Sequence, residues 1–381
     1  MDTIIKQFNK LENIKPADEQ IYKKVLDRWD GIAKPIRGLG RFEEITARIG
    51  AVLRTDDVDI RRRAAIVMCA DNGIVKEGVT QSGQEVTAAV AGWMGRMESS
   101  VCRMAEIAGA DIIPVDIGIN MEGSPEGVIN RKVRKGTDSF LTGPAMSDDD
   151  LEQAINTGID LVRDCKNKGY TVVATGEMGI GNTTTSSAVC AALLGLDPVK
   201  VTGRGAGLDN AGLQRKIGVI KRTLILHDLI NIRNVSAGEP DDGIRDKGAG
   251  LKETREYTLR VLRTVGGLDI AGLTGVFLGG ALYNIPVIID GFISAVSALA
   301  AERILPGTRE VMTASHLGRE GGMKYILDEL KLKAVIDADM ALGEGTGAVM
   351  LFPLLDAVLA LYHSGLRFED TGVDRYEHFE N

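Results

Sequence analysis

The feature that most constrains the fold of this chain is a series of short apolar segments that end in acidic or glycine-rich turns. Residues 64–70 read Ala-Ala-Ile-Val-Met-Cys-Ala and lead directly into Asp71, Asn72 and Gly73. A continuous apolar run of this length predicts a parallel β-strand that is buried on both faces. The other candidate strands are residues 111–117, 171–175, 286–289 and 311–314.

Segments with a helical pattern lie between these candidate strands. They are found near 85–107, 147–167, 209–228, 267–283, 292–303 and 318–330. Strands that alternate with helices indicate an α/β fold with a parallel sheet. We therefore expect a parallel, Rossmann-like sheet flanked by helices.

The two ends of the chain predict a second, smaller unit. Residues 1–50 have a helical pattern with Ile21, Val25 and Trp29 on one side, interrupted by proline and glycine between 34 and 40. The apolar helix predicted at 345–363 can pack back against these helices. We expect a small helical domain built from 1–60 with 345–381, beside a large α/β domain at 61–344. The polar, glycine-rich segment 232–256 is expected to be a surface excursion.

The overall charge argues against an anionic polymer as partner. Lys and Arg total 45 against 53 Asp and Glu, a formal net charge of −8. A surface for nucleic acid or an anionic membrane is not implied, although a local phosphate site needs only a few donors. The short basic run at Arg61, Arg62 and Arg63 is expected to be a solvated entry to the first strand.

Cysteine and histidine usage points to a cytoplasmic protein without a metal site. None of the four cysteines forms a CxxC pair and the four histidines are dispersed, which favours free thiols in a reducing cytosol and no bound metal. The chain start lacks the layout of a signal peptide, and no stretch reaches ~18 uncharged apolar residues. We therefore expect no membrane span and a cytoplasmic location. The cysteines are Cys69, Cys102, Cys165 and Cys190.

Acidic residues follow several of the predicted strands. Asp71, Asp116, Glu177 and Asp290 each come at or just after the end of one of them. In open α/β sheets, ligands bind at the carboxyl ends of the strands. One such acid could be a helix cap or a turn residue, but four together predict a functional site.

The most informative single segment is residues 175–185, Thr-Gly-Glu-Met-Gly-Ile-Gly-Asn-Thr-Thr-Thr. It follows a predicted strand and precedes an apolar helix, so glycine N–H groups and the positive end of the helix can cradle a phosphate. Asn182, Thr183 and Thr184 add short side-chain donors. No lysine follows the glycines, so this is not a Walker A loop. A capped glycine-rich turn explains the segment equally well.

Two further glycine clusters precede helices. Residues 202–209 contain G-x-G-x-G rather than G-x-G-x-x-G, so a dinucleotide-binding oxidoreductase is a weak alternative. Lys216, on the helix that follows, either reaches into a phosphate site or is simply exposed. Residues 342–347 place Glu344 among glycines, where it is either a helix cap or a catalytic base. A carboxylate that serves as a base works best when it is partly desolvated.

Together these segments resemble the family of nicotinate-nucleotide–dimethylbenzimidazole phosphoribosyltransferases, which activate the lower ligand of cobamides such as vitamin B12. The resemblance extends over nearly the whole chain, and Gly-Glu-Met-Gly-Ile-Gly-Asn-Thr-Thr at 176–184 is its most specific part. The other matching segments lie at 34–35, 38–41, 70–73, 77–79, 85–87, 143–146, 203–205, 207–209, 215–216, 290–292, 315–316 and 342–347.

The resemblance implies a fold, a reaction and an assembly. The fold is a parallel α/β catalytic domain with a small helical domain from both chain ends, and the assembly is a homodimer. The reaction displaces nicotinate from nicotinate mononucleotide and leaves an α-ribotide of an aromatic base, without a metal or another cofactor. The attack inverts C1′, so the acceptor and the departing nicotinate lie on opposite faces of the ribose. Because the cationic glycosyl nitrogen makes nicotinate a good leaving group, the reaction needs positioning, one base and carboxylates near an oxocarbenium-like centre.

The resemblance also implies roles for individual residues. Glu344 is the general base, and Glu177 lies close to the ribose as a second catalytic carboxylate. The residues expected to hold the nucleotide's phosphate and ribose are Gly176, Gly179, Gly181, Asn182, Thr183, Thr184, Gly203, Lys216, Asp290 and Ser315. The residues expected in the acceptor pocket are Ser82, Gln84, Met178 and Leu342.

Departures from the family pattern leave two alternatives open. Many relatives carry His at the position of Asn72, and a Pro-containing pair at Ser82 and Gly83, in a segment that borders the acceptor pocket. A phenol- or cresol-accepting homologue that works as one subunit of a heterodimer is therefore an alternative. The other is a non-catalytic, nucleotide-binding partner subunit, against which the presence of Glu344 and Glu177 counts.

Overall fold

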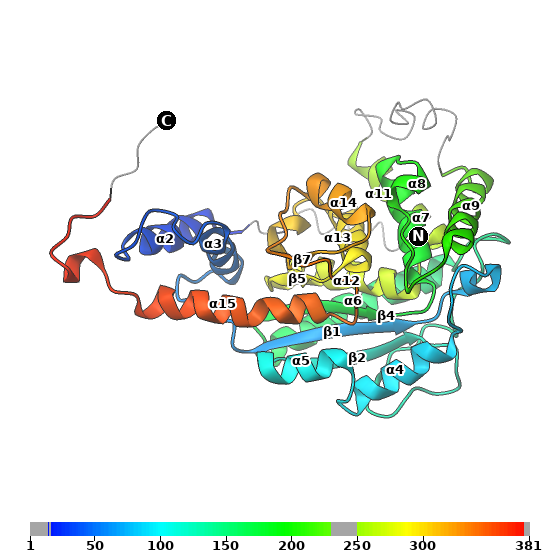
Figure 1. The fold of residues 1–381 in the computed structure, drawn as a ribbon, viewed down its shortest axis with the longest axis horizontal. Helices are drawn as coiled ribbons and strands as arrows, with labels where there is room; N and C mark the ends of the chain where they lie inside the picture. The colour runs from blue at the N-terminus through cyan, green and yellow to red at the C-terminus, as the bar shows by residue number, and fades with distance from the viewer. Residues whose placement is uncertain (1–13, 15–16, 230–249, 377–381) are drawn as a thin grey trace.

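The computed structural model describes residue 14 and residues 17–229 and 250–376, and it is built around a six-stranded sheet (Figure 1). The strand order is β3-β2-β1-β4-β5-β6, and every pair of neighbouring strands is parallel. This confirms the predicted fold class and all five predicted strands. The strands are β1 (Arg63–Ala70), β2 (Asp111–Gly118), β3 (Ile129–Asn130), β4 (Val172–Met178), β5 (Val287–Ile289) and β6 (Met312–Ala314).

Strand β1 is buried along its whole length because helices cover both faces of the sheet. Its side chains Ala65, Val67 and Cys69 pack into one apolar cluster, whereas Ile66 and Met68 pack into the other. This alternation follows from the two-residue period of a strand. The helices whose buried side chains belong to the first cluster include α4 (Glu85–Gly95), α5 (Ser100–Ala108) and α15 (Thr346–Ser364).

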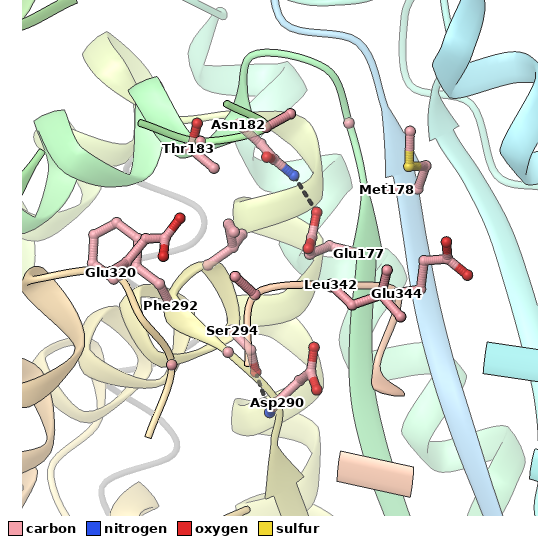
Figure 2. A pocket seen from close by; sticks show the side chains of 18 of the residues that line it. Glu177, Met178, Asn182, Thr183, Asp290, Phe292, Ser294, Glu320, Leu342 and Glu344 are labelled. Atoms are coloured by element: carbon pink, nitrogen blue, oxygen red, sulfur yellow. Dashed lines mark hydrogen bonds between the residues drawn. The ribbon is translucent and has the colours of Figure 1, made fainter. Parts of the chain in front are cut away.

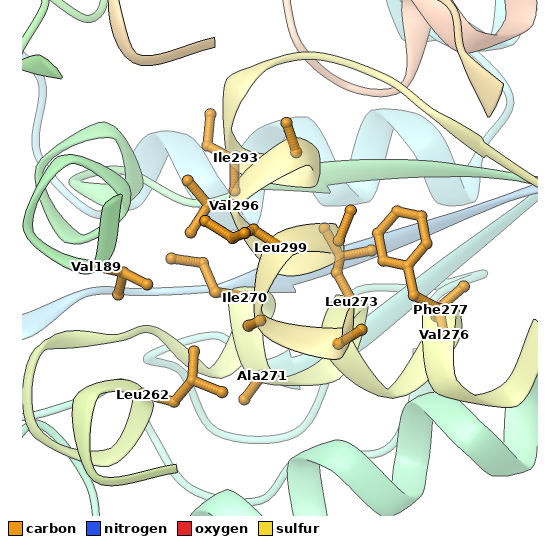
Figure 3. Packing of buried hydrophobic residues seen from close by; sticks show 14 of the residues in the cluster. Val189, Leu262, Ile270, Ala271, Leu273, Val276, Phe277, Ile293, Val296 and Leu299 are labelled. Carbon is orange, nitrogen blue, oxygen red and sulfur yellow. The ribbon is translucent and has the colours of Figure 1, made fainter. Parts of the chain in front are cut away.

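The second face carries the larger apolar cluster, part of which is shown in Figure 3. Ile270, Leu273 and Phe277 on α12 are fully buried there, close to Leu262 and Val296 from neighbouring helices. The helices on this side include α6 (Asp148–Asn167), α7 (Asn182–Leu194), α11 (Leu251–Val265), α12 (Leu268–Tyr283) and α13 (Phe292–Ile304). The remaining elements are η1 (Gly73–Glu77), α8 (Pro198–Val201), α9 (Asn210–Leu226), η2 (Thr308–Val311), β7 (His316–Leu317), α14 (Gly322–Leu330), β8 (Ile336–Asp337) and η3 (Phe368–Asp370).

Helices from the two chain ends pack together, as the sequence predicts. Helices α2 (Glu19–Asp30) and α3 (Arg41–Leu53) lie beside the C-terminal end of α15 (Figure 1). The rings of Trp29 and Tyr362 are 5.0 Å apart, and the Tyr362 hydroxyl donates a hydrogen bond to the carbonyl of Asp56 at 2.8 Å. Helix α15 also packs against β4 and α5. The division into domains 1–60 with 345–381 and 61–344 stays a prediction.

Several sequence-based boundaries are corrected by the structure. The helical pattern at 85–107 is two helices, and the helix predicted from 318 begins only at Gly322, after the short strand β7. The predicted excursion 232–256 ends too late, because Leu251 already starts α11; residues 232–249 lie outside the described part of the chain. The amphipathic α11 was missed because its polar face dominates its first two turns, while Leu259 and Leu262 are fully buried.

The basic run before β1 is not entirely solvated. Arg63 is buried, and its guanidinium donates two hydrogen bonds to the Asp356 carboxylate of α15, at 2.7 and 2.8 Å. The prediction of an exposed run is therefore wrong for this residue, whereas Arg61 and Arg62 are exposed. The paired geometry ties α15 to the start of the central strand.

By length and composition alone, α15 is apolar enough to cross a membrane, and it is the one such helix among the described residues. Its residues Leu351, Phe352 and Leu355 are fully or almost fully buried in the first apolar cluster. Core helices of globular proteins have the same composition, so this finding carries little weight.

Candidate active site

A cavity of ≈ 300 Å³ opens at the carboxyl ends of β4, β5 and β6 (Figure 2). Its walls come from four segments that are far apart in the chain: 177–183, 290–294, 316–320 and 340–344, with 205–206 at one side. The strand order reverses between β1 and β4, so the cavity lies beside the topological switch point of the sheet. This is where open α/β sheets bind their ligands.

The structure brings half of the predicted site residues to this cavity. Those that line it are Glu177, Met178, Gly179, Asn182, Thr183, Asp290, Leu342 and Glu344. A smaller adjoining cavity of ≈ 70 Å³ shares Gly179, Asn182 and Thr183 and adds Ser82 and Gly181. The predicted residues that line neither cavity are Gly176, Thr184, Gly203, Lys216, Ser315 and Gln84.

Glu344 sits in a left-handed turn at the start of α15. Its φ is +61°, between Gly343 at +83° and Gly345 at +92°. A left-handed conformation is uncommon for a residue with a side chain, so the surroundings must hold it in place. Asp290 does so, because its carboxylate accepts the N–H groups of Gly345 at 3.2 Å and Ala348 at 3.0 Å. The carboxylate at the end of β5 thus caps α15 and positions the Glu344 turn.

The same turn crosses directly over β4 at Gly176. A Cβ atom at Gly176 would lie 2.6 Å from the carbonyl oxygen of Glu344 and 2.9 Å from the Gly345 nitrogen. The absence of a side chain therefore lets the backbone of the turn approach the strand. Gly176 does not face the cavity, and its contribution is to the position of Glu344 rather than to a phosphate cradle.

Replacing Gly176 by alanine is expected to lower activity by more than it lowers stability. The new Cβ overlaps backbone atoms of the Glu344 turn, which must move, and overpacking of this kind costs ~1–3 kcal/mol. The measurements are the free energy of unfolding and kcat. Gly218→Ala is the matched control, since a Cβ there meets nothing within 4 Å in the middle of α9. Unchanged activity of Gly176→Ala would contradict the assigned role.

The Glu344 carboxylate points toward the N-terminus of α5. Its Oε2 atom accepts the backbone N–H of Val101 at 3.2 Å, and the residue is half-buried. The positive end of a helix stabilises a negative charge at this position. In Figure 2, Glu344 lies on one side of the cavity, while Thr183 and Glu320 lie on the other.

Glu177 belongs to a buried network that the sequence did not predict. The Asn182 amide donates one hydrogen bond to Glu177 Oε2 and one to Asp269 Oδ2, the latter at 3.1 Å. Burial, followed by the nearby Asp269 carboxylate, raises the pKa of Glu177 to about 8, and burial raises the pKa of Asp269 to about 6. Glu177 therefore carries a proton near neutral pH in the ligand-free protein.

The network changes the predicted role of two residues. The donors of Asn182 are used by carboxylates, so its side chain is not the free phosphate donor that was predicted. Thr184 is completely buried beneath the helix start and does not reach the cavity. Asp269, in the first turn of α12, was not predicted because no predicted strand precedes it; the only local signal is the glycine pair at Gly266 and Gly267.

Lys216 is completely buried and reaches toward the start of α7. Its Nζ atom donates a hydrogen bond to Thr183 Oγ1 at 2.8 Å, and burial lowers its pKa to about 8. The alternative that it is an exposed helical lysine is therefore wrong. Helix α7 begins after Gly181, at φ +97°, and no side chain caps it. A buried cation thus stands behind an open helix N-terminus.

The apolar part of the cavity includes Met178 and Leu342. Their assignment to an acceptor pocket stays a prediction. Gln84 lies apart from it, where its amide donates to the Asn72 carbonyl at 3.2 Å and accepts from the Asn120 amide at 3.0 Å. The apolar lining residues that the sequence did not predict are Val90, Ile180, Ala206, Phe292, Ile293, Met340 and Ala341.

Ser315 supports the site from behind. Its hydroxyl donates to the carbonyl of Ile289 at 2.7 Å and lies 3.0 Å from His316 Nδ1, whose ring lines the cavity. Ser315 itself is buried and does not line the cavity, so in this structure its side chain is not placed to contact a nucleotide bound there. Among the described residues, no group of three or more His, Cys, Asp or Glu side chains could hold a metal ion.

Comparisons with known proteins agree on one family. A family model described as phosphoribosyltransferase matches residues 14–373. The nicotinate-nucleotide–dimethylbenzimidazole phosphoribosyltransferase of Ruminiclostridium cellulolyticum is 39% identical over 370 residues, which is 97% of this chain and 98% of the relative. The enzyme of the same name from Chloroflexus aggregans is 39% identical over 365 residues, 95% of this chain and 96% of the relative. The crystal structure of CobT from Thermus thermophilus superposes with a TM-score of 0.81 at 35% identity, covering 94% of this chain and 100% of that one.

Proposed function

Because the chain belongs to the nicotinate-nucleotide–dimethylbenzimidazole phosphoribosyltransferase family, we propose that it transfers ribose 5-phosphate from nicotinate mononucleotide to 5,6-dimethylbenzimidazole or a related lower-ligand base. The products are nicotinate and α-ribazole 5′-phosphate, the nucleotide used in cobamide nucleotide-loop assembly. One observation carries the proposal: a single cavity has an open helix N-terminus backed by Lys216 at one side and Glu344 at the other.

The phosphate is bound at the start of α7. The N–H groups of Asn182 and Thr184 already donate to the carbonyls of Gly179 and Gly181. The helix dipole therefore favours a dianion here together with the nearby ammonium of Lys216, which supplies a full positive charge. Gly179 and Gly205 line the wall here without side chains, which leaves room for the phosphate oxygens. Thr183 links this site to Lys216 through its hydroxyl.

The reaction is a displacement at C1′ of the ribose. Nicotinate leaves readily because its ring nitrogen is cationic in the mononucleotide, and the acceptor enters from the opposite face. Glu344 removes the proton of the acceptor nitrogen, and Asp290 positions Glu344 through the N–H groups that it accepts. Glu177 faces the reacting centre, where the cationic substrate favours loss of its proton and leaves a carboxylate that stabilises an oxocarbenium-like transition state.

The acceptor ring lies in the apolar part of the cavity. In Figure 2, Leu342 lies between Glu177 and Glu344, and Met178 lies above Glu344; both line the cavity and present apolar surface suited to a flat aromatic base. The names of the relatives favour dimethylbenzimidazole over a phenol, and they do not favour the heterodimeric alternative.

The deciding experiment supplies the purified chain with nicotinate mononucleotide and a panel of benzimidazoles, adenine and phenols. We expect nicotinate release that depends on the acceptor, with dimethylbenzimidazole among the best, followed by chromatography and mass spectrometry of the ribotide. Release without any acceptor would indicate hydrolysis instead of transfer. No release with any acceptor would reject the proposed activity for the isolated chain.

We also propose that the protein is a cytoplasmic homodimer. The outer face of α15 leaves Met350, Leu354 and Leu361 partly exposed, which is apolar surface suited to a second copy of the chain. Light scattering is expected to give the mass of two chains of 40.8 kDa. Leu354→Asp is expected to shift that mass toward one chain, and a wild-type mass of one chain would contradict the proposal.

A further inference from the structure

Glu320 lines the cavity but takes no part in the proposed displacement at C1′ or in proton transfer. It precedes α14 and is half-buried, with its side chain close to Gly203 and on the same side of the cavity as Thr183 (Figure 2). Burial raises the pKa of Glu320, while the charges of Lys216 and Arg319 oppose that shift. A carboxylate thus stands beside the lysine that we assign to the phosphate.

The other carboxylates of the cavity already have hydrogen-bond donors. Glu177 accepts from the Asn182 amide, and Asp290 accepts two backbone N–H groups of the α15 start. The Glu344 carboxylate accepts the N–H group of Val101.

Within the described part of the chain, the carboxylate oxygens of Glu320 accept no hydrogen bond. Glu320 therefore has acceptor capacity left for whatever fills the cavity that it lines.

The chemistry of the substrate restricts what Glu320 can bind. Near neutral pH, the phosphate and the carboxylate of nicotinate mononucleotide are hydrogen-bond acceptors, and its pyridinium nitrogen carries no hydrogen. Its donors are the 2′- and 3′-hydroxyls of the ribose, and the proton of the acceptor base is directed to Glu344. Two neighbouring hydroxyls match the two oxygens of one carboxylate, as in other ribose-binding sites.

We propose that Glu320 accepts hydrogen bonds from the vicinal hydroxyls of the ribose and makes the enzyme select ribonucleotides over 2′-deoxyribonucleotides. This inference rests on the proposed function, because it takes the mononucleotide as the occupant of the cavity. Glu320 is then a specificity-determining residue: it touches the sugar but takes no part in proton transfer.

The test combines substitutions at Glu320 with the removal of one hydroxyl from the substrate. We would measure kcat/KM for nicotinate release from nicotinate mononucleotide and from its 2′-deoxy analogue, with saturating dimethylbenzimidazole. The proteins are the wild type, Glu320→Ala, Glu320→Gln and the control Glu310→Gln, an exposed glutamate outside the cavity. The deoxy analogue cleaves more easily by itself, but this effect cancels when the substrate preference of a variant is divided by that of the wild type.

Glu320→Ala is expected to lose roughly 10- to 100-fold in kcat/KM on the ribonucleotide and only a few-fold on the deoxy analogue, as expected when a hydrogen bond to a charged group is removed. The ratio of its kcat/KM on the ribonucleotide to that on the deoxy analogue is therefore expected to fall well below the wild-type ratio. Glu320→Gln, which keeps one acceptor oxygen, is expected to be intermediate, and Glu310→Gln is expected to match the wild type. Equal losses of kcat/KM on both substrates, or an unchanged ratio between them, would overturn the proposal. Glu320 would then act only through its charge, close to Lys216.

Two further measurements keep this outcome separate from that of the proposed function. Melting temperatures show whether a variant is folded. If Glu320→Ala does not fold, the substrate preference of Glu320→Gln tests the proposal instead. Calorimetric dissociation constants for both nucleotides report the preference without turnover. A wild type that releases no nicotinate would reject the proposed function, whereas the ratio of these dissociation constants would still decide the role of Glu320.

Discussion

Replacing Glu344 by glutamine is expected to lower kcat by roughly 10²–10⁴-fold, the usual contribution of a general base. The amide has nearly the same shape and can still accept the Val101 N–H, so the turn and the start of α5 are preserved. It cannot remove the proton from the acceptor nitrogen, however. The KM for nicotinate mononucleotide is expected to change little, because the proposed phosphate site lies on the other side of the cavity.

Steady-state nicotinate release at saturating acceptor measures this effect. Glu106→Gln, on the exposed side of α5, is a suitable control for the loss of a single surface carboxylate. A folded Glu344→Gln enzyme with near-normal turnover would remove Glu344 from the mechanism. The buried Glu177 would then be the remaining candidate for the base.

Replacing Lys216 by methionine is expected to raise the KM for nicotinate mononucleotide by roughly 10- to 150-fold, the loss expected for a hydrogen bond between charged groups. Methionine keeps most of the buried volume and removes the positive charge behind the phosphate. The variant is expected to fold normally, since burial already disfavours the charged form of Lys216 in the empty site. Lys221→Met, on the same helix α9 but paired with Asp197 away from the cavity, is the control.

The same lysine predicts a pH dependence. Burial lowers the pKa of Lys216 to about 8, so the ligand-free protein loses this positive charge as the pH rises through that value. Because kcat/KM reports the ionisation of free enzyme, it is expected to fall above about pH 8 in the wild type. The fall that is due to Lys216 should be absent in Lys216→Met. An identical profile and an unchanged KM in the variant would contradict this role of Lys216. Glu177, whose pKa is also about 8, cannot explain such a fall, because loss of its proton gives the carboxylate that the proposed reaction uses.

Most of the fold could be predicted from the sequence because its signals are local. The apolar run at 64–70 became β1, and the glycine-rich segment at 175–185 became the end of β4 and the start of α7. The period of the apolar residues and the turn-forming glycines act over a few residues, and a single chain displays them directly. The helix α11 was missed where its polar face dominated the local composition.

The candidate site could be predicted only in part, because its geometry depends on contacts between distant segments. Glu344 and Glu177 were predicted from glycine motifs and family resemblance, and both line the cavity. Glu320 and Asp269 were not, since neither lies in a motif of its own. Gly176 and Asn182 were predicted as phosphate ligands, but the structure places one beneath the Glu344 turn and the other between two carboxylates.

By itself, the sequence determined the order of the five main strands and of most helices, the family, and the residue types available at the strand ends. Only the tertiary structure decided which of these side chains meet. The hydrogen bond from Asn182 to Asp269 joins residues 87 positions apart, and that from Val101 to Glu344 joins residues 243 positions apart. Burial depends on the same long-range packing, so the pKa shifts of Glu177 and Lys216 follow from tertiary structure as well. Local periodicity carries no information about such distances, because it is set by backbone geometry over one or two turns.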